Sequence, residues 1–161
     1  MTCEARMIRL GSVTGLPVVC AGRMLGRVEQ AILTQSGKKL RGMVIRKGMG
    51  GAKWLDNAQI IVIGGVSVLV QGKPGRLPRD TDFALGSVKD VSGLRLGRVT
   101  DVFLNPETRC VTALEISPGP LEELRGGRSL VREFVVRPTL QEPGQVLVPC
   151  GFILEQDRQG R

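Results

Sequence analysis

The residues in this chain best suited to chemistry are basic side chains gathered between positions 38 and 53. The cluster, with the tryptophan that follows it, consists of Lys38, Lys39, Arg41, Arg46, Lys47, Lys53 and Trp54. Ammonium and guanidinium groups bind phosphates and carboxylates, and an indole ring can stack on a base or fill the edge of a core. We therefore predict a site for phosphates or for an acidic protein face here; the alternative is a solvated basic surface.

The charge of the chain is concentrated in its first half. Residues 1–80 hold 13 basic and 4 acidic side chains, a net charge of +9, whereas residues 81–161 hold 10 and 11, a net charge of −1. Such an asymmetry is typical of a surface that faces nucleic acid, an anionic membrane or an acidic protein. At the positions of the second half that match the cluster stand Arg109 and Glu115, so no comparable basic set is expected there.

The composition argues against an enzyme. The chain contains no histidine, which removes the commonest general base and the commonest metal ligand. Its cysteines stand far apart with no CxxC pair, and we expect buried free thiols rather than ligands or disulfides. They are Cys3, Cys20, Cys110 and Cys150. We expect no catalytic residue, no metal and no cofactor.

A sequence repeat identifies the elements that must position the basic cluster. Residues 22–28, Gly-Arg-Met-Leu-Gly-Arg-Val, return 71 positions later at 93–99 as Gly-Leu-Arg-Leu-Gly-Arg-Val. The same offset relates 40–45 to 111–116. A constant offset across separate stretches indicates two copies of one unit, and units of this size bury so little surface that we expect the copies to dock on each other or on a partner.

The glycines of the repeat could suggest a phosphate-binding loop, but their recurrence ahead of an Arg-Val strand favours turns that need glycine geometry. These structural turn glycines are Gly22, Gly26, Gly93 and Gly97. The run 48–53, Gly-Met-Gly-Gly-Ala-Lys, lacks the spacing of a nucleotide-binding loop and precedes no expected helix. We predict a flexible loop there.

Short runs rich in Val and Ile, separated by Gly, Pro, Ser and Asn, predict strands throughout. The only helical candidate is 121–124, beside the acidic pair Glu122–Glu123. Apolar residues stand three together in 31–33 and 102–104, as in strands that bulge while passing round a small closed barrel. The fold class is therefore all-β, with two small β-barrels in tandem. A segment rich in Pro, Gly and basic residues links them.

The pattern Gly-x-x-x-Gly-Arg-Val, then an apolar triplet, a turn and a second strand, resembles the PRC-barrel family. That family includes the cytoplasmic domain of the photosynthetic reaction-centre H subunit and the C-terminal domain of a ribosome maturation factor, and the chain looks most like its tandem bacterial members. The segments Leu10–Val13 and Leu85–Val88, both Leu-Gly-Ser-Val, fit the start of each barrel. The resemblance implies a first PRC-barrel at 8–70, a linker at 71–83, a second barrel at 84–152 and a tail at 153–161.

The resemblance implies a binding or scaffold protein that acts through barrel surfaces on a protein partner. The alternatives are an RNA- or ribosome-associated factor that holds phosphates with the basic first barrel, a peripheral membrane protein, and a homo-oligomer. The longest apolar run, 60–70, is too short to span a bilayer, and the first residues lack the apolar block of a signal peptide, so we expect a cytoplasmic location.

Overall fold

The computed structural model describes residues 6–119 and 127–149, and the backbone of 155–156. Within these ranges the chain is nearly all β, with one four-residue helix, α1 (Leu10–Val13), and one 3-10 turn, η1 (Asn57–Gln59). The all-β prediction is confirmed. The helical candidate at 121–124 and the acidic pair within it lie outside the described residues.

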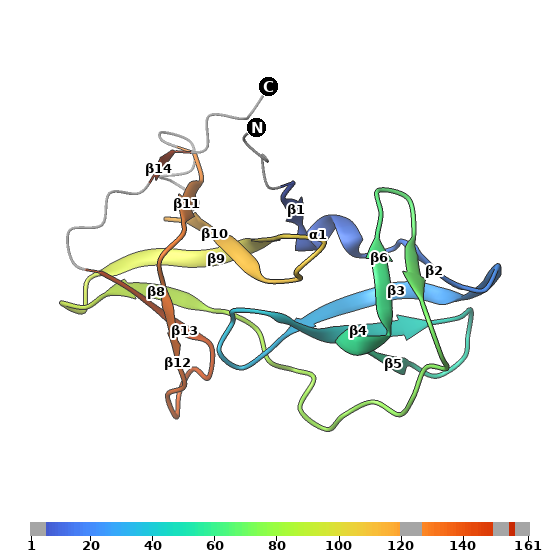
Figure 1. The fold of residues 1–161 in the computed structure, drawn as a ribbon. Coiled ribbons are helices and arrows are strands. Elements are labelled where there is room, and N and C mark those ends of the chain that lie inside the picture. The colour runs from blue at the N-terminus through green and yellow to red at the C-terminus, as the bar shows by residue number, and fades with distance from the viewer. Residues whose placement is uncertain (1–5, 120–126, 150–154, 157–161) are drawn as a thin grey trace.

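The first repeat forms a six-stranded sheet (Figure 1). Its strands are β2 (Pro17–Cys20), β3 (Arg23–Leu33), β4 (Leu40–Arg46), β5 (Lys53–Asp56), β6 (Ile60–Ile63) and β7 (Val68–Val70). The spatial order is β5-β4-β3-β2-β7-β6, and all neighbours are antiparallel except the parallel pair β2 and β7.

The second repeat has the same strand order. Its strands are β8 (Ser87–Asp90), β9 (Arg95–Leu104), β10 (Val111–Ser117), β11 (Ser129–Val131), β12 (Val135–Arg137) and β13 (Gln145–Val148). They follow the order β11-β10-β9-β8-β13-β12, again with one parallel pair, β8 and β13. Two further strands, β1 (Ile8–Arg9) on β9 and β14 (Glu155–Gln156) on β11, enlarge this sheet.

Neither sheet closes into the barrel that the sequence predicts, because no ladder joins its two edge strands within the described ranges. In the first repeat β5 instead turns a corner into β6 through η1. Asp56 caps this turn by accepting the amide N–H of Ala58 at 3.1 Å, and Gln59 accepts the N–H of Asp56 at 3.1 Å. The outer edge of β5 pairs with the linker, where Trp54 and Gly75 exchange backbone hydrogen bonds of 2.9 and 2.7 Å. That edge is therefore not free for β6.

The bulges that the apolar triplets predict are present: at the triplets the β3–β4 register slips between Ile32 and Leu33, and the β9–β10 register slips between Phe103 and Leu104. Each ladder has a further slip ahead of its triplet. The β3–β4 register slips between Val28 and Gln30, and the β9–β10 register slips between Val99 and Asp101, its counterpart in the second copy. Gly26 and Gly97 have φ of 151° and 149°. A Cβ there would lie 2.7 Å from the Arg46 carbonyl oxygen and 2.2 Å from that of Ser117. Glycine at these positions therefore lets β3 approach β4, and β9 approach β10, more closely than another residue would.

The two identical Leu-Gly-Ser-Val segments adopt different structures. In the first copy Leu10–Val13 forms α1, whereas Ser87 and Val88 of the second segment open strand β8. The strand equivalent to β8 is β2, because both pair with the same neighbours in their sheets. The same four residues therefore have different structures in the two units. Tertiary contacts decided the outcome, since a four-residue sequence has too weak a propensity to fix its own conformation.

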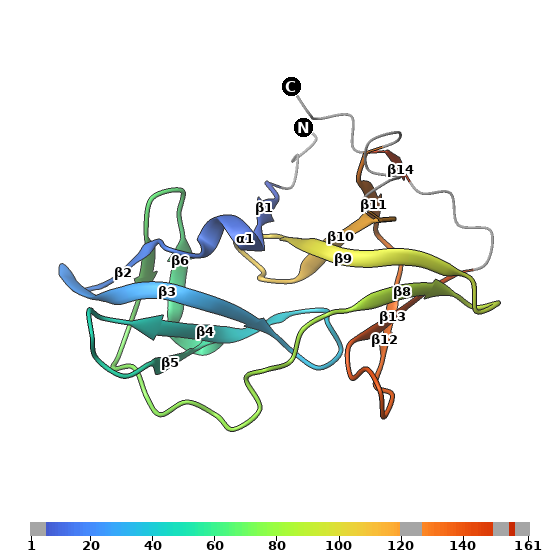
Figure 2. The ribbon, with the colours of Figure 1, turned by 180° about the vertical axis from the view of Figure 1, so that it is seen from behind.

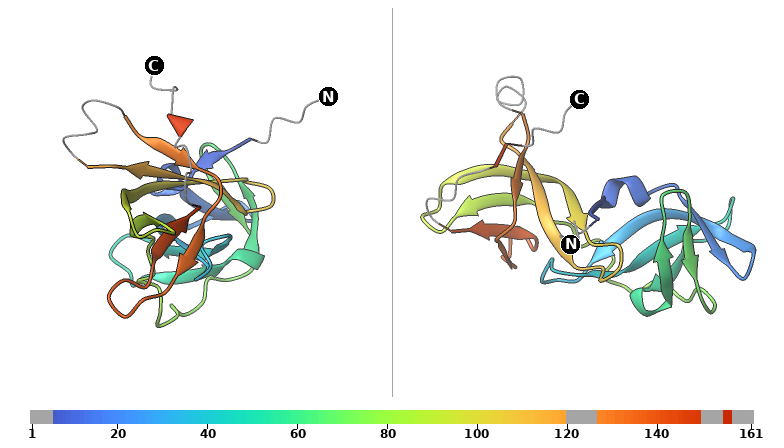
Figure 3. Two further views of the ribbon diagram at one scale, coloured as in Figure 1. Left: turned by 90° about the vertical axis from the view of Figure 1, so that its left-hand side faces the viewer. Right: turned by 45° about the horizontal axis from the view of Figure 1, so that its top comes forward.

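Each sheet covers its own apolar core, and each core contains one leucine from the other repeat. Leu104 of β9 is fully buried among the side chains of the first core, and Leu33 of β3, 7% exposed, packs in the second core. These leucines are 71 positions apart. The ends of the β3–β4 and β9–β10 hairpins meet at the junction (Figure 3). Each hairpin places its leucine in the core of the other repeat.

Backbone hydrogen bonds at this junction are reciprocal. The amide of Leu40 donates to the Arg109 carbonyl at 2.9 Å, and the amide of Val111 donates to the Lys38 carbonyl at 2.8 Å. Each donor and acceptor is 71 positions from its counterpart, and Lys39 and Cys110 form a β-bridge between them. The junction thus has the local pseudo-two-fold symmetry of an isologous interface.

The segments that precede the repeats also cross over. β1, which precedes the first repeat, pairs with β9 of the second. The linker, which precedes the second repeat, runs along the first sheet (Figure 2) and packs Leu77 against a small cluster of Ile32, Val44 and Trp54. Each sheet is therefore partly covered by the segment that leads into the other repeat.

A buried carboxylate fixes the N-terminal segment to the second repeat. Glu115 of β10, with its side chain 1% exposed, accepts hydrogen bonds from Arg9 at 2.6 Å, Thr100 at 2.9 Å and Arg128 at 3.0 Å. Burial acts to raise the pKa of Glu115, but the hydrogen bonds of Thr100 and Arg9 and the charges of Arg9 and Arg128 outweigh it and lower the pKa. Glu115 is therefore ionised in the folded chain at neutral pH.

We predict that Leu104→Ala destabilises the first repeat although Leu104 belongs to the second, because it empties part of the first core. The expected loss is about 2–5 kcal/mol of unfolding free energy. Trp54 is the only tryptophan and lies in the first sheet, so its fluorescence during urea unfolding measures the effect. Leu94→Ala, at a leucine 63% exposed, is the control and should change little. A Trp54 transition unchanged by Leu104→Ala would contradict the exchange.

We predict that Glu115→Gln lowers the free energy of unfolding by about 2–3 kcal/mol at neutral pH. This is at the low end of the cost of breaking a buried ion pair, because Arg9 and Arg128 can both turn toward water. The pKa of Glu115 is lowered in the fold, so its contribution is present above the ordinary value of 4.5 and is lost as the pH falls below it. Urea midpoints measured between acidic and neutral pH should therefore converge for the two proteins in acid. Glu107→Gln, at an exposed carboxylate, should give the wild-type profile.

Candidate functional site

The predicted basic cluster does not form one surface, because the start of β4 lies at the junction. The ammonium group of Lys38 donates to the Phe134 carbonyl and stands 3.5 Å from the centre of the Phe134 ring, and burial lowers its pKa. Lys39 takes part in the bridge to Cys110. These lysines connect the two repeats through β4 and its hairpin.

Arg41 and Trp54 are also engaged in the fold. The Arg41 guanidinium pairs with Asp80 of the linker at 3.1 Å, which lowers the pKa of that carboxyl, and lies 5.6 Å from the centre of the Trp54 ring. Trp54 is only 7% exposed and packs on Ile32 and Val44. Of its two sequence-based interpretations, stacking on a base and filling the edge of a core, the structure shows the second.

Arg46 at the end of β4 shapes the glycine-rich loop. It pairs with Glu29 at 3.0 Å and donates to the Gly50 carbonyl at 3.0 Å. The amide of Gly50 in turn donates to the Lys47 carbonyl at 3.0 Å. These bonds place the loop between β4 and β5 and leave Met49 at its tip fully exposed.

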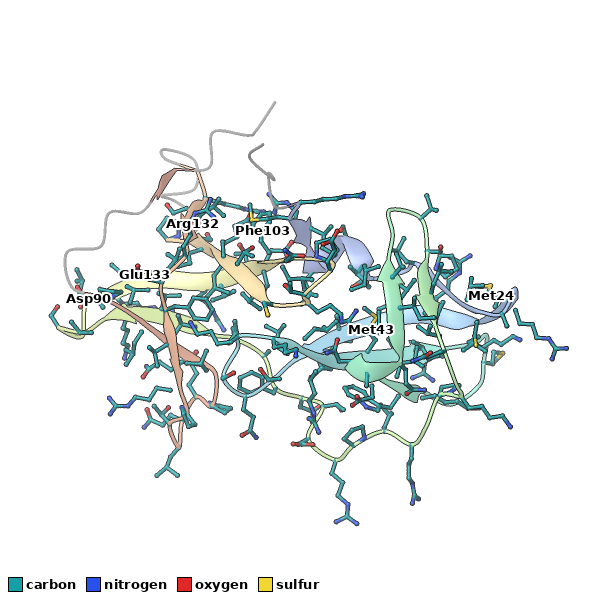
Figure 4. The ribbon with its side chains drawn as sticks, viewed as in Figure 1. Met24, Met43, Asp90, Phe103, Arg132 and Glu133 are labelled. Carbon is teal, nitrogen blue, oxygen red and sulfur yellow. The ribbon has the colours of Figure 1, made fainter. Side chains whose placement is uncertain are left out.

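The remaining lysines of the cluster meet at a groove at the outer end of the first sheet. The groove has a volume of about 400 Å³. Lysines form its rim and apolar side chains its floor, and we call it the lysine groove. Its lining residues are Met24, Leu25, Ile45, Lys47, Gly50, Gly51, Lys53, Lys73 and Pro74. Met24, 41% exposed, is labelled at this end of the molecule in Figure 4.

Lys73 belongs to the groove although the sequence assigns it to the linker. Gln59 of η1 donates its side-chain amide to the Lys73 carbonyl at 2.9 Å and to the Gln71 carbonyl at 3.3 Å, and so fixes the linker backbone beside β5. No local sequence signal indicates this, because the contact depends on a corner turn fourteen residues away. The sequence-based site therefore missed one of the three lysines.

The groove is positively charged throughout. Its lining residues include no acidic side chain, and none of the three lysines pairs with a carboxylate within the described ranges. A cationic rim over an apolar floor attracts a ligand that is both anionic and apolar.

The described carboxylates and thiols do not gather into a cluster that could hold a metal ion. No group of three or more His, Cys, Asp or Glu side chains comes together in residues 6–119 and 127–149. Asp90 accepts the hydroxyl and amide of Ser92 and the amide of Leu94, which lowers its pKa and caps the β8–β9 turn. Cys110 is exposed and Cys20 half-buried, so the prediction of buried thiols is wrong for Cys110.

The sequence was compared with models of protein families and with curated proteins, and nothing matched. The resemblance to the PRC-barrel family therefore stays a prediction. No helix within the described ranges has the length and apolar character needed to cross a membrane.

We predict that Trp54 contributes to stability and not to partner contact. Trp54→Ala should cost about 3–5 kcal/mol of unfolding free energy, since it removes a large buried side chain, whereas Trp54→Phe should cost less. In the wild type, iodide should quench Trp54 emission weakly. Strong quenching, or a Trp54→Ala variant of unchanged stability, would contradict the buried position.

Proposed function

We propose that the chain is a non-enzymatic binding protein, an adaptor of PRC-barrel type, that holds an acidic segment of a partner protein in the lysine groove. The observation that supports this proposal is that one groove combines three lysines at its rim with an apolar floor. Carboxylates of the segment would meet Lys47, Lys53 and Lys73, and an apolar side chain would lie on Leu25 and Met24. The proposed setting is the bacterial cytoplasm, as the resemblance implies.

The exposed methionines support a peptide ligand. Met24, which lines the groove, is 41% exposed, and Met49 is fully exposed in the loop whose next residues, Gly50 and Gly51, line it. Methionine is flexible and polarizable, and it is common on surfaces that accept varied peptide side chains. A ligand that offered charge alone would gain nothing from this apolar area, whereas an acidic peptide with a leucine or phenylalanine would bury it.

RNA is the second candidate, because a net charge of +8 attracts any polyanion. Sequence-tolerant binding of single strands normally adds aromatic side chains on which bases stack. Of the four aromatic side chains in the described ranges, Trp54 and Phe134 are buried, Phe83 and Phe103 are partly buried, and none is exposed. The first repeat thus has basic side chains that can bind phosphates but no exposed aromatic ring on which a base could stack. This favours an acidic protein over RNA as the ligand.

We predict that a variant with Lys47→Ala, Lys53→Ala and Lys73→Ala binds a short fluorescent peptide of alternating glutamate and leucine at least roughly tenfold more weakly, as expected for the loss of three exposed charge contacts. Fluorescence anisotropy measures the affinity. The matched control, Arg6→Ala with Arg76→Ala and Arg79→Ala, removes the same charge elsewhere and should bind nearly as the wild type does.

Further probes separate the proposed ligand from other anions. A glutamate–serine peptide should bind more weakly than the glutamate–leucine peptide, because it leaves the apolar floor uncovered. Single-stranded RNA and vesicles with acidic lipid should bind more weakly than the peptide at physiological salt. Tighter binding of RNA or vesicles, or an equal loss in the control variant, would overturn the proposal.

A further inference from the structure

The repeat symmetry relates the lysine groove to a second hollow at the outer end of the second sheet. This second hollow has a volume of about 410 Å³. It is lined by Arg95, Gly97, Arg98, Thr100, Ser117 and Pro118, with Gly119 beside them. Arg95 occupies the position of Met24, and Pro118 that of Lys47, each 71 positions along the chain. The place in the fold is the same, but the charged residues come from different positions.

The same arginines line a third hollow on their other side. It has a volume of about 420 Å³ and is lined by Ser87, Lys89, Arg95, Arg98, Gln141 and Glu142. Arg95 and Arg98 thus stand between two hollows, with Lys89 at the edge of one. We call these three residues the arginine ridge.

A β-bulge explains why two residues three apart on β9 can share one hollow. Val88 pairs with Gly97 and Lys89 with Arg95, so Leu96 is an extra residue in the ladder and turns inward. Simple alternation would place positions 95 and 98 on opposite faces of the strand. With the bulge, both arginines are exposed on the same side as the half-buried Lys89.

The one acid in this region is already satisfied. Glu142 accepts the hydroxyl and the amide of Ser87, both at 2.5 Å. These hydrogen bonds, and the charges of Arg98 and Arg95, lower the pKa of Glu142. Neither arginine forms an ion pair in the described part of the chain. Three cations against one anchored carboxylate leave a net positive site.

The chemistry of the ridge differs from that of the groove. A guanidinium group presents a planar fork of N–H donors that matches a carboxylate with two parallel hydrogen bonds, whereas an ammonium group acts as a point charge. The ridge also lacks the exposed methionines of the first repeat. It therefore fits a stretch of consecutive acidic side chains and needs no apolar anchor.

The two basic sites lie at opposite ends of the molecule. Figure 4 labels Met24 at the outer end of the first sheet and Asp90, next to Lys89, at the outer end of the second. The junction stands between them, with its hairpin ends and reciprocal hydrogen bonds. One acidic segment at each end would thus be held at a fixed separation.

We propose that the arginine ridge is a second binding site for an acidic peptide segment, and that the chain bridges two such segments. The bridging rests on the proposed function of the lysine groove; the ridge itself rests on its own geometry. The chain is then a bivalent adaptor, and segments that are linked to each other would bind with an avidity that neither site provides alone.

The test is a calorimetric titration of the full chain with an all-glutamate peptide and with the glutamate–leucine peptide. The glutamate–leucine peptide should bind the wild type at two sites, tightly at the lysine groove and more than about tenfold more weakly at the arginine ridge, which has no apolar floor. Lys89→Ala with Arg95→Ala and Arg98→Ala should reduce the number of sites to one, and so should the triple lysine variant. All six substitutions together should abolish binding. The matched control for the ridge is Arg76→Ala with Arg79→Ala and Arg137→Ala, which should keep two sites.

The outcomes separate the two proposals. A stoichiometry of one that the ridge variant leaves unchanged and the lysine variant abolishes would overturn the ridge and keep the groove. The reverse pattern would overturn the groove and support the ridge. No binding of either peptide would overturn both. Circular dichroism and Trp54 emission establish that each variant is folded.

A conservative variant tests the forked geometry. Arg95→Lys with Arg98→Lys keeps the charge of the ridge but removes the planar donors. The all-glutamate peptide should therefore bind the ridge of this variant several-fold more weakly than it binds the ridge of the wild type, and binding at the lysine groove should not change. Equal affinity would show that the ridge acts as charge alone and would overturn its assignment as a carboxylate site. Bridging is then read directly: immobilised peptide should retain labelled peptide only when the wild-type chain is present.

Discussion

The exchange of Leu33 and Leu104 between the two cores is the constraint on which the structure depends. A unit of this size buries only about 60% of its unfolded surface and is marginal alone, and here each core is completed by a leucine of the other. The reciprocal hydrogen bonds of Leu40 and Val111 hold the backbone at the junction. The two sheets therefore depend on each other for stability. The outer ends of the sheets take no part in this exchange.

The junction also explains why only part of the predicted basic cluster lines the lysine groove. Lys38 and Arg41 lie close to the junction, where their side chains contact the Phe134 ring and Asp80, and the backbone of Lys39 forms the bridge to Cys110. Lys47 and Lys53 lie farther from the junction and line the lysine groove. A count of basic residues in the sequence thus overstates the surface available to a partner, since hairpins at an interface use their lysines and arginines to connect elements.

The two copies also differ away from the junction. Val44, which packs beneath Trp54, corresponds to Glu115, which is buried with Arg9 and Arg128. Met24 in the lysine groove corresponds to Arg95 in the arginine ridge. A common strand order therefore carries two basic sites of different chemistry, one with an apolar floor and one with paired guanidinium groups. The difference suits an adaptor whose two ends meet different acidic sequences.

The sequence alone determined the all-β class, the repeat, the bulges, and the membership of Lys47 and Lys53 in a basic surface. These features follow from local pattern, because the 71-residue offset and the apolar triplets are visible in the residues themselves. Only the tertiary structure decided that the sheets stay open, that Leu-Gly-Ser-Val is a helix once and a strand once, and that Lys73 and the ridge of Lys89, Arg95 and Arg98 belong to sites. Each of these depends on residues distant in the chain: the linker pairs with β5, β8 pairs with its neighbours, Gln59 binds the Lys73 carbonyl, and β9 bulges at Leu96 against β8. Local propensity is too weak to set such contacts, since the free energy that decides them comes from packing between segments that the sequence keeps apart.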